Sequence, residues 1–220
     1  MTATGAGPLC TRQRGPALVA KRTIDVLVAA SLLVLCAPVL FLAAIAVRAT
    51  SPGPALYRGT RVGRFGERFT VYKLRSMVAD ADPAIHAAYV HELSCGRGVE
   101  SDGLYKLHDD PRITPVGRWL RRTSLDELPQ LVNVLKGDMS LVGPRPECEY
   151  DLADYESWHW RRFSVLPGMT GLWQVSGRGC LPPPEMLRLD VEYADTWSLR
   201  QDLSILLRTV PAVLTERGSR

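Results

Sequence analysis

Residues 123–146 of this 220-residue chain read TSLDELPQLVNVLKGDMSLVGPRP, and the features that decide its fold and chemistry gather there. The stretch opens with two adjacent carboxylates, Asp126 and Glu127, and closes with Arg145 between two prolines. Lys136 followed by a glycine predicts the end of a short helix, because a cation suits the negative end of the helix dipole and glycine readily adopts the left-handed cap. The pattern therefore places a carboxylate pair and a rigid arginine loop on either side of one helix.

The start of this helix has two possible positions. Ser124 and Glu127 have the spacing of a capping box, in which each side chain accepts a hydrogen bond from the other residue's backbone N–H. Alternatively, Asp126 is the N-cap, which puts Pro129 in the first turn, where the N–H is unpaired anyway. Both alternatives place the carboxylates at the positive end of a helix, where a phosphate would also bind.

The carboxylate pair is interpreted as more than a helix cap, although acidic caps are common. Arg121 and Arg122 directly precede the pair. Neighbouring residues do not share a helix face, so Asp126 and Glu127 can have different roles. Arg145 lies on a loop stiffened by prolines, and a fixed guanidinium suits bidentate binding of phosphate. The stretch therefore predicts a site for a phosphorylated ligand.

Length and charge limit the class of protein. A chain of 220 residues can bury one core, so one domain with attachments is expected. The net charge is +4, but residues 1–75 hold 11 Lys and Arg against 2 Asp and Glu, which leaves a net −5 for the rest. The basic part surrounds the most apolar stretch and indicates an anionic membrane surface or an anionic substrate. No nucleic-acid-binding motif is present, so no nucleic-acid partner is expected.

The cysteines and histidines do not predict a metal site or a disulfide framework. The five cysteines are scattered and form no C-x-x-C pair, which favours reduced thiols in a cytoplasmic setting. The four histidines also lack the spacing of metal ligands.

An uncharged apolar run at 26–47 is long enough to cross a bilayer as a straight helix. Pro38 lies in its middle and either kinks a spanning helix or breaks the run into legs of 12 and 9 residues. At ~1.5 Å per residue, neither leg crosses ~30 Å of hydrocarbon. Lys21 and Arg22 before the run and Arg48 after it favour a cytoplasmic position for both ends, as in a hairpin that enters and leaves on one side. Hydropathy leaves both arrangements open.

Local signals predict the remaining elements and an α+β, mostly helical fold. Leu56–Gly59 and Phe69–Leu74 are expected to be short strands joined by a Gly- and Arg-rich link. Thr114 as N-cap and Pro115 in the first turn predict a helix that runs to Arg122. The other expectations are a disordered tail at 1–16, helices at 80–93, 149–163, 184–195 and 199–214, a loop at 94–104, a tight turn at 167–171 and a short strand at 172–175.

Four ordered motifs carry a family resemblance. They are VYKLRSM (71–77), DPRITPVGRWLRRTSLDELPQLVNVLKGDMSLVGPRPE (110–147), PGMTGLWQVSGR (167–178) and LDVEYADTWSLRQDLSIL (189–206). Together they resemble the bacterial sugar transferases, small monotopic phosphoglycosyl transferases that start exopolysaccharide and glycan assembly. The resemblance covers residues 18–215, and an ordered set of long motifs is far more specific than a single Asp-Glu-Leu-Pro.

The resemblance implies an activity and a location. The family transfers a sugar-1-phosphate from a UDP-sugar to undecaprenyl phosphate, a polyprenyl phosphate, and releases UMP. It works with Mg²⁺ at the cytoplasmic face of the bacterial inner membrane. Its apolar segment is a re-entrant helix-break-helix, which here would cover residues 17–50 and break at Pro38, after Ala37 in place of the usual serine. A cytoplasmic transferase domain with a short hairpin and interfacial amphipathic helices would cover residues 51–215.

The resemblance also implies roles for single residues. Asp126 matches the nucleophile that forms a phosphoglycosyl-aspartate, and Glu127 matches its acidic partner. The two carboxylates are also the expected Mg²⁺ ligands. The expected substrate- and phosphate-binding residues are Lys73, Arg75, Arg121, Arg145 and Asp190.

The donor, the partners and one alternative function complete the expectations. TSLDELPQL and TGLWQVSGR look most like exopolysaccharide-type members that use UDP-galactose or UDP-glucose. The expected partners are the UDP-sugar, undecaprenyl phosphate and an anionic lipid surface, and a homodimer is compatible with the sequence. The alternative is a membrane-anchored, catalytically silent scaffold of a polysaccharide assembly complex. A scaffold would not need the carboxylate pair, the arginine loop and Lys73 together.

Overall fold

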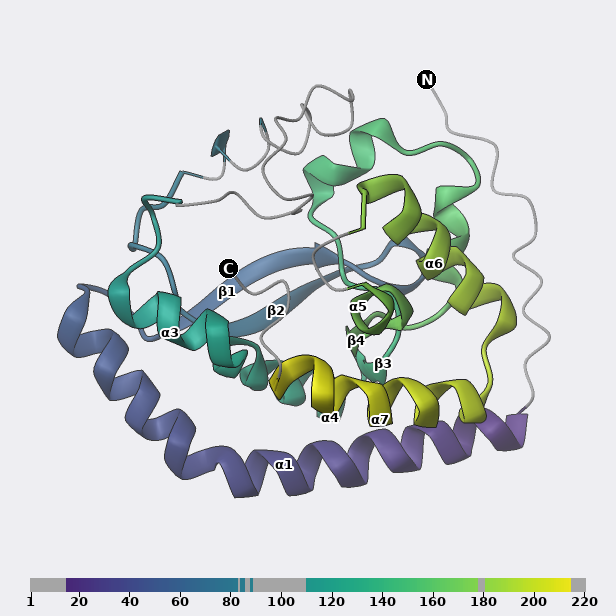
Figure 1. Cartoon of the computed structure of the whole chain (residues 1–220), viewed down its shortest axis with the longest axis horizontal. Helices are drawn as coiled ribbons and strands as arrows, with labels where there is room; N and C mark the ends of the chain where they lie inside the picture. The colour runs from purple at the N-terminus through teal and green to yellow at the C-terminus, as the bar shows by residue number, and fades with distance from the viewer. Residues whose placement is uncertain (1–14, 83, 86–87, 89–109, 178–180, 215–220) are drawn as a thin grey trace.

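The computed structural model describes residues 15–82, 84–85, 88, 110–177 and 181–214. The loop expected at 94–104, nearly all of the tail expected at 1–16 and most of the helix expected at 80–93 lie outside the described residues. The described part is mostly helical, with two small two-stranded sheets (Figure 1). This agrees with the predicted α+β, mostly helical class.

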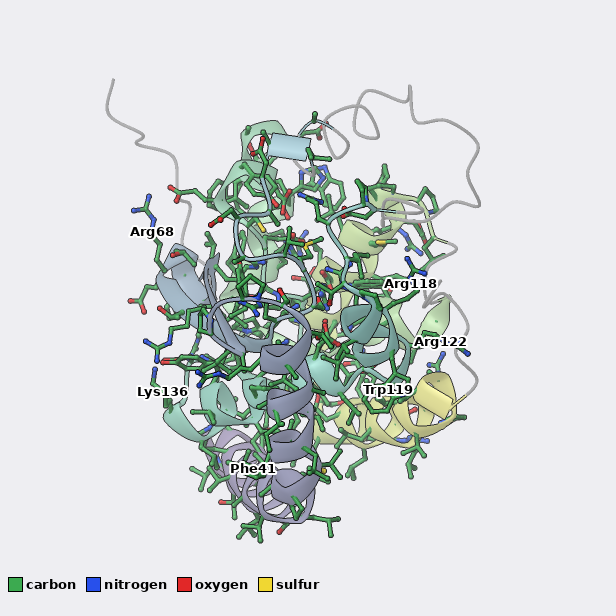
Figure 2. All side chains as sticks on the ribbon, turned by 90° about the vertical axis from the view of Figure 1, so that its left-hand side faces the viewer. Phe41, Arg68, Arg118, Trp119, Arg122 and Lys136 are labelled. Carbon is green, nitrogen blue, oxygen red and sulfur yellow. The ribbon has the colours of Figure 1, made fainter. Side chains whose placement is uncertain are left out.

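The first helix, α1 (Gly15–Thr50), lies along one side of the molecule (Figure 1). Within the described ranges it is the one helix long and apolar enough to cross a membrane, by length and composition alone. Four of its 36 residues are buried. Its outer face is apolar and exposed, as Phe41 shows in Figure 2. A face of this kind suits a lipid environment better than water.

Pro38 lies inside α1, and the helix continues through it. Proline has no N–H to donate to the carbonyl of Val34, and its ring crowds that carbonyl. Figure 1 shows α1 bent near its middle, as a proline kink would produce. The break expected at Pro38 is therefore a bend within one helix, which the hydrogen bonds on either side hold together.

The predicted hairpin is confirmed, and its strands are longer than expected. β1 (Leu56–Val62) and β2 (Arg68–Leu74) pair antiparallel along their whole length. A 3₁₀ turn, η1 (Arg64–Gly66), joins them, with Phe65 in the left-handed region at a φ of 59°. β2 continues directly into residues 75–77, where the carbonyl of Ser76 accepts from Thr114 N at 3.1 Å.

A second sheet forms from β3 (Ser140–Val142) and β4 (Gly168–Thr170), which pair in parallel. The tight turn expected at 167–171 is therefore wrong, because these residues extend to pair with a strand much earlier in the chain. The strand expected at 172–175 is also wrong, since Leu172–Ser176 form a short helix, α5. Parallel pairing needs a long crossover, so neighbouring residues give no signal of it.

Three predicted helices are confirmed. Thr114 Oγ1 accepts a hydrogen bond from Gly117 N at 3.0 Å and caps α3 (Pro115–Thr123). The helices α6 (Pro183–Thr196) and α7 (Leu199–Leu214) match the predicted ranges. In Figure 1, α7 runs beside the first half of α1.

The helix expected at 149–163 is wrong. Two 3₁₀-helices, η3 (Glu149–Asp154) and η4 (His159–Ser164), replace it. Between them, Glu156 N donates to the ring nitrogen Nδ1 of His159 at 2.9 Å. A side chain that takes a backbone N–H in this way competes with the helical hydrogen bond.

The main core lies between α1, β2, β3, α6, α7 and the short helix α4 (Leu131–Lys136). As predicted, Gly137 ends α4 in the left-handed conformation, at a φ of 93°. Asn133 is fully buried: its Nδ2 donates to Thr70 O at 2.6 Å, and its Oδ1 accepts from Tyr72 N at 3.1 Å. These bonds fasten α4 to β2 and so align the segment just before α4 with the end of the hairpin.

Candidate active site

Asp126 and Glu127 lie in η2 (Leu125–Gln130), a 3₁₀-helix between α3 and α4. Ser124 ends α3 in the left-handed conformation, at a φ of 57°, and its side chain makes no cap hydrogen bond. Both expected helix starts, the capping box and the Asp126 N-cap, are therefore wrong. Pro129 gives the physical reason, because its missing N–H and its ring disfavour a regular α-helix through this segment.

Glu127 is the meeting point of two cations from distant parts of the chain. Its Oε1 accepts from Lys73 Nζ at 3.2 Å and from an Arg145 guanidinium nitrogen at 3.0 Å. Lys73 comes from β2, and Arg145 from the loop after β3. The three side chains are 18–32% exposed, so a ligand in solvent can reach them. The structure thus brings together three of the predicted site residues.

Electrostatics keep Glu127 ionised. Burial alone would raise the pKa of Glu127, but the charges of Arg145 and Lys73 outweigh it and hold that pKa well below its usual range. Burial lowers the pKa of Lys73, and the attraction of Glu127 only partly offsets this. Glu127 raises the pKa of Arg145. Each cation keeps further N–H donors, which can bind phosphate oxygens.

Asp126 is more deeply buried than Glu127, with 8% of its surface exposed. Arg121 reaches the same region from α3, where its Nε donates to Ser76 Oγ at 2.9 Å. Burial lowers the pKa of Arg121, and the charge of Asp126 is the strongest influence that opposes this, so the two side chains lie within electrostatic reach. α3 can pack closely against Ser76 because residue 117 is glycine. A Cβ at Gly117 would collide with the carbonyl of Ser76.

Arg75 lies elsewhere than predicted. It is buried, and its guanidinium donates to the carbonyls of Ser51 and Pro52, both at 2.7 Å. These carbonyls belong to the turn that follows α1. Arg75 therefore holds the start of the hairpin against the end of α1, and the structure does not bring it to the Glu127 cluster.

The loop that carries Arg145 is fixed by backbone contacts with β4. Gly143 N donates to Thr170 O at 2.9 Å, and Gly168 N donates to Pro144 O at 2.8 Å. Gly143 has to be glycine, because a Cβ there would collide with the chain just before β4. The parallel pairing that the sequence did not predict is thus the support of the predicted arginine loop.

Arg162, which no motif singled out, lies at the centre of a buried network. It is 1% exposed and donates to the carbonyl of Arg145 at 2.8 Å. The same guanidinium pairs with Asp190 and Glu147 and donates to the Tyr155 hydroxyl at 2.5 Å. Arg162 therefore holds the backbone of the arginine loop from the buried side.

Asp190 is linked to the loop through Arg162, which pairs with its carboxylate and donates to the carbonyl of Arg145. It is 2% exposed, and burial is the main cause that raises its pKa to about 7. The structure places it beneath the loop and not beside Glu127. The sequence around Arg162 reads HWRRF at 159–163, which sets two arginines among aromatic residues but does not indicate which of them is buried.

Asp126 and Glu127 fit a metal ion whose other ligands come from the substrate better than a metal ion held by the protein alone. Within the described ranges, no three His, Cys, Asp or Glu side chains are grouped so that they could hold a metal ion. Asp126 and Glu127 offer adjacent carboxylates, and one oxygen of Glu127 is already held by Lys73 and Arg145. Mg²⁺ commonly binds through one or two carboxylates and takes its other ligands from substrate phosphates and water. The donor set fits an ion of that kind.

Several known proteins are similar to this chain, and three of them illustrate the likeness. The galactosyl transferase CpsE of Streptococcus agalactiae serotype III is 43% identical over 92% of this chain and 44% of its own length. The undecaprenyl-phosphate galactose phosphotransferase of Salmonella typhimurium is 42% identical over 90% of this chain and 41% of its own. The UDP-glucose:undecaprenyl-phosphate glucose-1-phosphate transferase of Caulobacter vibrioides is 46% identical, over 89% and 70% respectively.

The chain spans less than half the length of the first two of these relatives. A sequence model of the family described as bacterial sugar transferase matches residues 16–216. That match covers nearly the whole chain and includes every motif on which the resemblance rests. The chain belongs to the bacterial sugar transferase family.

Proposed function

We propose that this protein transfers a hexose-1-phosphate from a UDP-sugar to undecaprenyl phosphate and releases UMP, as the first membrane step of exopolysaccharide or glycan synthesis. The observation that carries the proposal is the convergence of Lys73 and Arg145 on Glu127, next to the buried Asp126. Two cations and a carboxylate pair, on a domain joined to an apolar helix, suit an anionic donor and an acceptor in the membrane. The names of the Salmonella and Caulobacter relatives support the same reaction class.

Asp126 is the proposed nucleophile. Its carboxylate oxygen bonds to the β-phosphorus of the donor, the bond from that phosphorus to the bridging oxygen breaks, and UMP leaves with the electron pair. An oxygen of undecaprenyl phosphate then attacks the same phosphorus, and the carboxylate of Asp126 is restored. An acyl phosphate is reactive enough to pass on the group, so a carboxylate suits this two-step route.

The cations offset the repulsion between an anionic nucleophile and an anionic diphosphate. Arg145 and Lys73 keep donors for phosphate oxygens, and Arg121 adds a third positive charge near Asp126. The attraction of these positive charges is strongest when negative charge moves onto the leaving UMP. An interaction that is stronger in the transition state than in the bound substrate speeds the chemical step.

We also propose Mg²⁺ as the cofactor, held by Asp126 or Glu127 together with the donor phosphates. The ion would neutralise diphosphate charge and polarise the leaving group. Glu127 then has two alternative roles, because it either contributes to the metal site or accepts a proton from the acceptor phosphate. Its firm ionisation suits metal binding.

The acceptor is a membrane lipid, so the proposal includes a re-entrant α1 that holds the site at the cytoplasmic face of the inner membrane. The bend near the middle of α1, its exposed apolar face and the basic residues at both ends support this arrangement. Arg118, Trp119 and Arg122 are exposed along one edge of α3 (Figure 2), where they would meet anionic headgroups. Accessibility labels at Lys21 and Arg48 that lie on opposite sides of the membrane would refute the re-entrant arrangement.

The test is UMP release by the full chain in membranes with Mg²⁺, for a panel of UDP-sugars with and without undecaprenyl phosphate. UDP-galactose and UDP-glucose are the expected donors. Asp126→Asn should lower turnover by about 10⁴-fold or more, the scale at which nucleophiles act. The matched control is Asp195→Asn. Asp195 lies away from the site, and its carboxylate pairs with Arg161 at a distance of 2.7 Å.

The outcomes separate the candidate functions. Release that depends on one sugar, on Mg²⁺ and on Asp126 would support the transferase and name its donor. Near-normal turnover by Asp126→Asn would refute the covalent route. No release with any donor, from folded protein with acceptor present, would favour the silent scaffold.

A further inference from the structure

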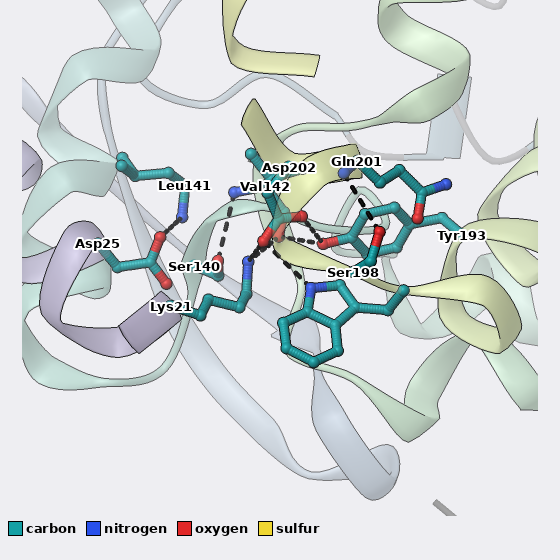
Figure 3. A network of polar contacts seen from close by, with 10 residues as sticks. Lys21, Asp25, Ser140, Leu141, Val142, Tyr193, Ser198, Gln201 and Asp202 are labelled. Atoms are coloured by element: carbon teal, nitrogen blue, oxygen red, sulfur yellow. Dashed lines mark hydrogen bonds and ion pairs between the residues drawn. The ribbon is translucent and has the colours of Figure 1, made fainter. Parts of the chain in front are cut away.

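A buried polar network fastens the first turns of α1 to the domain (Figure 3). Lys21 Nζ donates to Asp202 Oδ2 of α7 at 2.7 Å and to the carbonyl of Val142 in β3 at 3.1 Å. Tyr193 of α6 donates its hydroxyl proton to that carbonyl at 3.0 Å, or to Asp202 Oδ1 at 2.7 Å. Trp197 Nε1 donates to Asp202 Oδ2 at 3.1 Å. Four segments of the chain thus meet at one carbonyl and one carboxylate.

Asp25, one turn further along α1, holds the adjacent residue of β3. Its Oδ1 accepts from the backbone N–H of Leu141 at 3.1 Å, and the residue is 3% exposed. The β4 side of β3 uses other N–H groups: Ser140 N donates to Pro167 O, just before β4, and Gly143 N donates to Thr170 O. Lys21 and Asp25 therefore bind two consecutive residues of β3, one through its carbonyl and the other through its N–H.

This attachment lies directly before the loop that carries Arg145. Val142 is the last residue of β3, and Gly143 and Pro144 are the only residues between it and Arg145. Proline fixes its own φ and restricts the residue before it, so a shift of Val142 would be passed to Arg145 with little damping. The register of β3 against α1 thus sets the position of the guanidinium that Glu127 binds.

Stability alone does not explain these polar groups. A buried ion pair often contributes no more to stability than apolar side chains of similar size, and its best-attested role is to fix register. Asp25 is also an acidic residue in a helix that is otherwise suited to lipid. An apolar residue there would pack against β3 but would not specify which of its residues lies opposite.

We propose that Lys21 and Asp25 are positioning residues, which hold Leu141 and Val142 so that Arg145 faces the anionic donor. The proposal rests on the transferase function proposed above. It makes the membrane helix part of the machinery that aligns the site, and not only an anchor.

The test compares Asp25→Ala, Asp25→Asn and Arg22→Ala in the full chain in membranes. Asparagine keeps an oxygen that can accept from Leu141 N–H, whereas alanine removes it. Arg22 is the matched control, because it also ties α1 to the domain, through the carbonyls of Val134 and Leu135 at 2.6 and 2.9 Å, but does not bind β3. Two quantities are measured: kcat at saturating donor, and amide hydrogen exchange across residues 141–146.

Asp25→Ala should lower kcat about 10- to 100-fold, the scale of a catalytic group displaced by about 1 Å. It should also speed exchange in residues 141–146 about tenfold, as loss of one hydrogen bond would. In Asp25→Asn, kcat and the exchange rate should both stay close to the wild-type values. In Arg22→Ala, neither should change by more than about threefold, because substitutions at independent sites have little effect on each other.

Equal losses in Asp25→Ala and Arg22→Ala would overturn the inference, because they would indicate general loosening of α1. A wild-type kcat in Asp25→Ala, or an asparagine variant as poor as alanine, would also overturn it. Failure of the transferase function itself would appear differently, as no UMP release by the wild type. The exchange measurement would then still decide whether Asp25 holds the loop.

Discussion

Replacing Asp190 by asparagine should flatten the dependence of stability on pH. Asp190 is 2% exposed and shares Arg162 with Glu147, so two carboxylates lie around one guanidinium. Burial raises the pKa of Asp190 to about 7, the charge of Glu147 raises it further, and Arg162 pulls it down. Within the described part of the chain, Asp190 Oδ1 has no hydrogen-bond partner, so charge on that oxygen gains no hydrogen bond.

The sign and size of the effect follow from this pKa. A carboxyl with a higher pKa in the folded state binds its proton more tightly there, so its contribution to stability is complete below the unfolded value of 3.8 and is lost as the pH rises to about 7. About three pH units at about 1.4 kcal/mol each give about 4 kcal/mol. For a chain of this size that is a fall of about 10 °C in Tm.

The assay is thermal unfolding of the full chain in nanodiscs, followed by tryptophan fluorescence from pH 4 to pH 8. Asparagine has nearly the shape of the protonated carboxyl, so Asp190→Asn and the wild type should agree near pH 4. At pH 8 the variant should be the more stable by about 10 °C. Burial also raises the pKa of Asp151 to about 7. Asp151 is present in both proteins, so it gives both the same remaining dependence of Tm on pH. Asp195→Asn, at an exposed ion pair, controls for loss of one acidic charge.

Parallel curves for the variant and the wild type would refute the reasoning. They would mean that Arg162 keeps Asp190 ionised down to the pKa of an ordinary carboxyl. A variant that is less stable than the wild type at pH 8 would go further and show that the ion pair with Arg162 stabilises the fold.

Three further changes test other parts of the structure. Lys73→Met keeps the stem but removes a charge that Glu127 holds, so UMP release at saturating donor should fall about 10- to 100-fold, with unchanged circular dichroism; a normal rate would remove Lys73 from the site. Arg75→Met leaves two carbonyls without their donor and should lower the free energy of unfolding in urea by about 3 kcal/mol. The donor KM should stay the same, and a large rise in it would return Arg75 to the phosphate site. Asn133→Leu removes the bonds between α4 and β2 and should cost about 2–4 kcal/mol in the same assay; an unchanged unfolding midpoint would contradict the role of Asn133.

Elements with local causes were predictable from the sequence. Thr114 and Pro115 start α3, Gly137 ends α4, and two short strands around a Gly- and Arg-rich link form the hairpin, as expected. Each of these features depends on contacts within a few residues, which a sequence displays directly. The family resemblance was visible for a related reason, because it rests on motifs that the sequence displays directly.

The candidate site was predicted in part. Lys73, Glu127 and Arg145 meet as expected, because two positive side chains attract one carboxylate. Arg75 and Lys73 are both cationic and only two residues apart, and the sequence alone did not separate them. The tertiary structure gives them different surroundings. Lys73 lies within β2 and reaches Glu127, whereas Arg75 follows β2 and meets two carbonyls of the turn after α1.

The sequence by itself determined the family, the start of α3, the end of α4 and the residue types of the site. Only the tertiary structure decided the register of β3 against α1 and β4 and the contact of Arg162 with the arginine loop. Those features depend on partners far apart in the chain and on buried charges whose partners must be known before their effect can be judged. Local propensity carries no information about such partners, and burial decides which of the possible pairings forms.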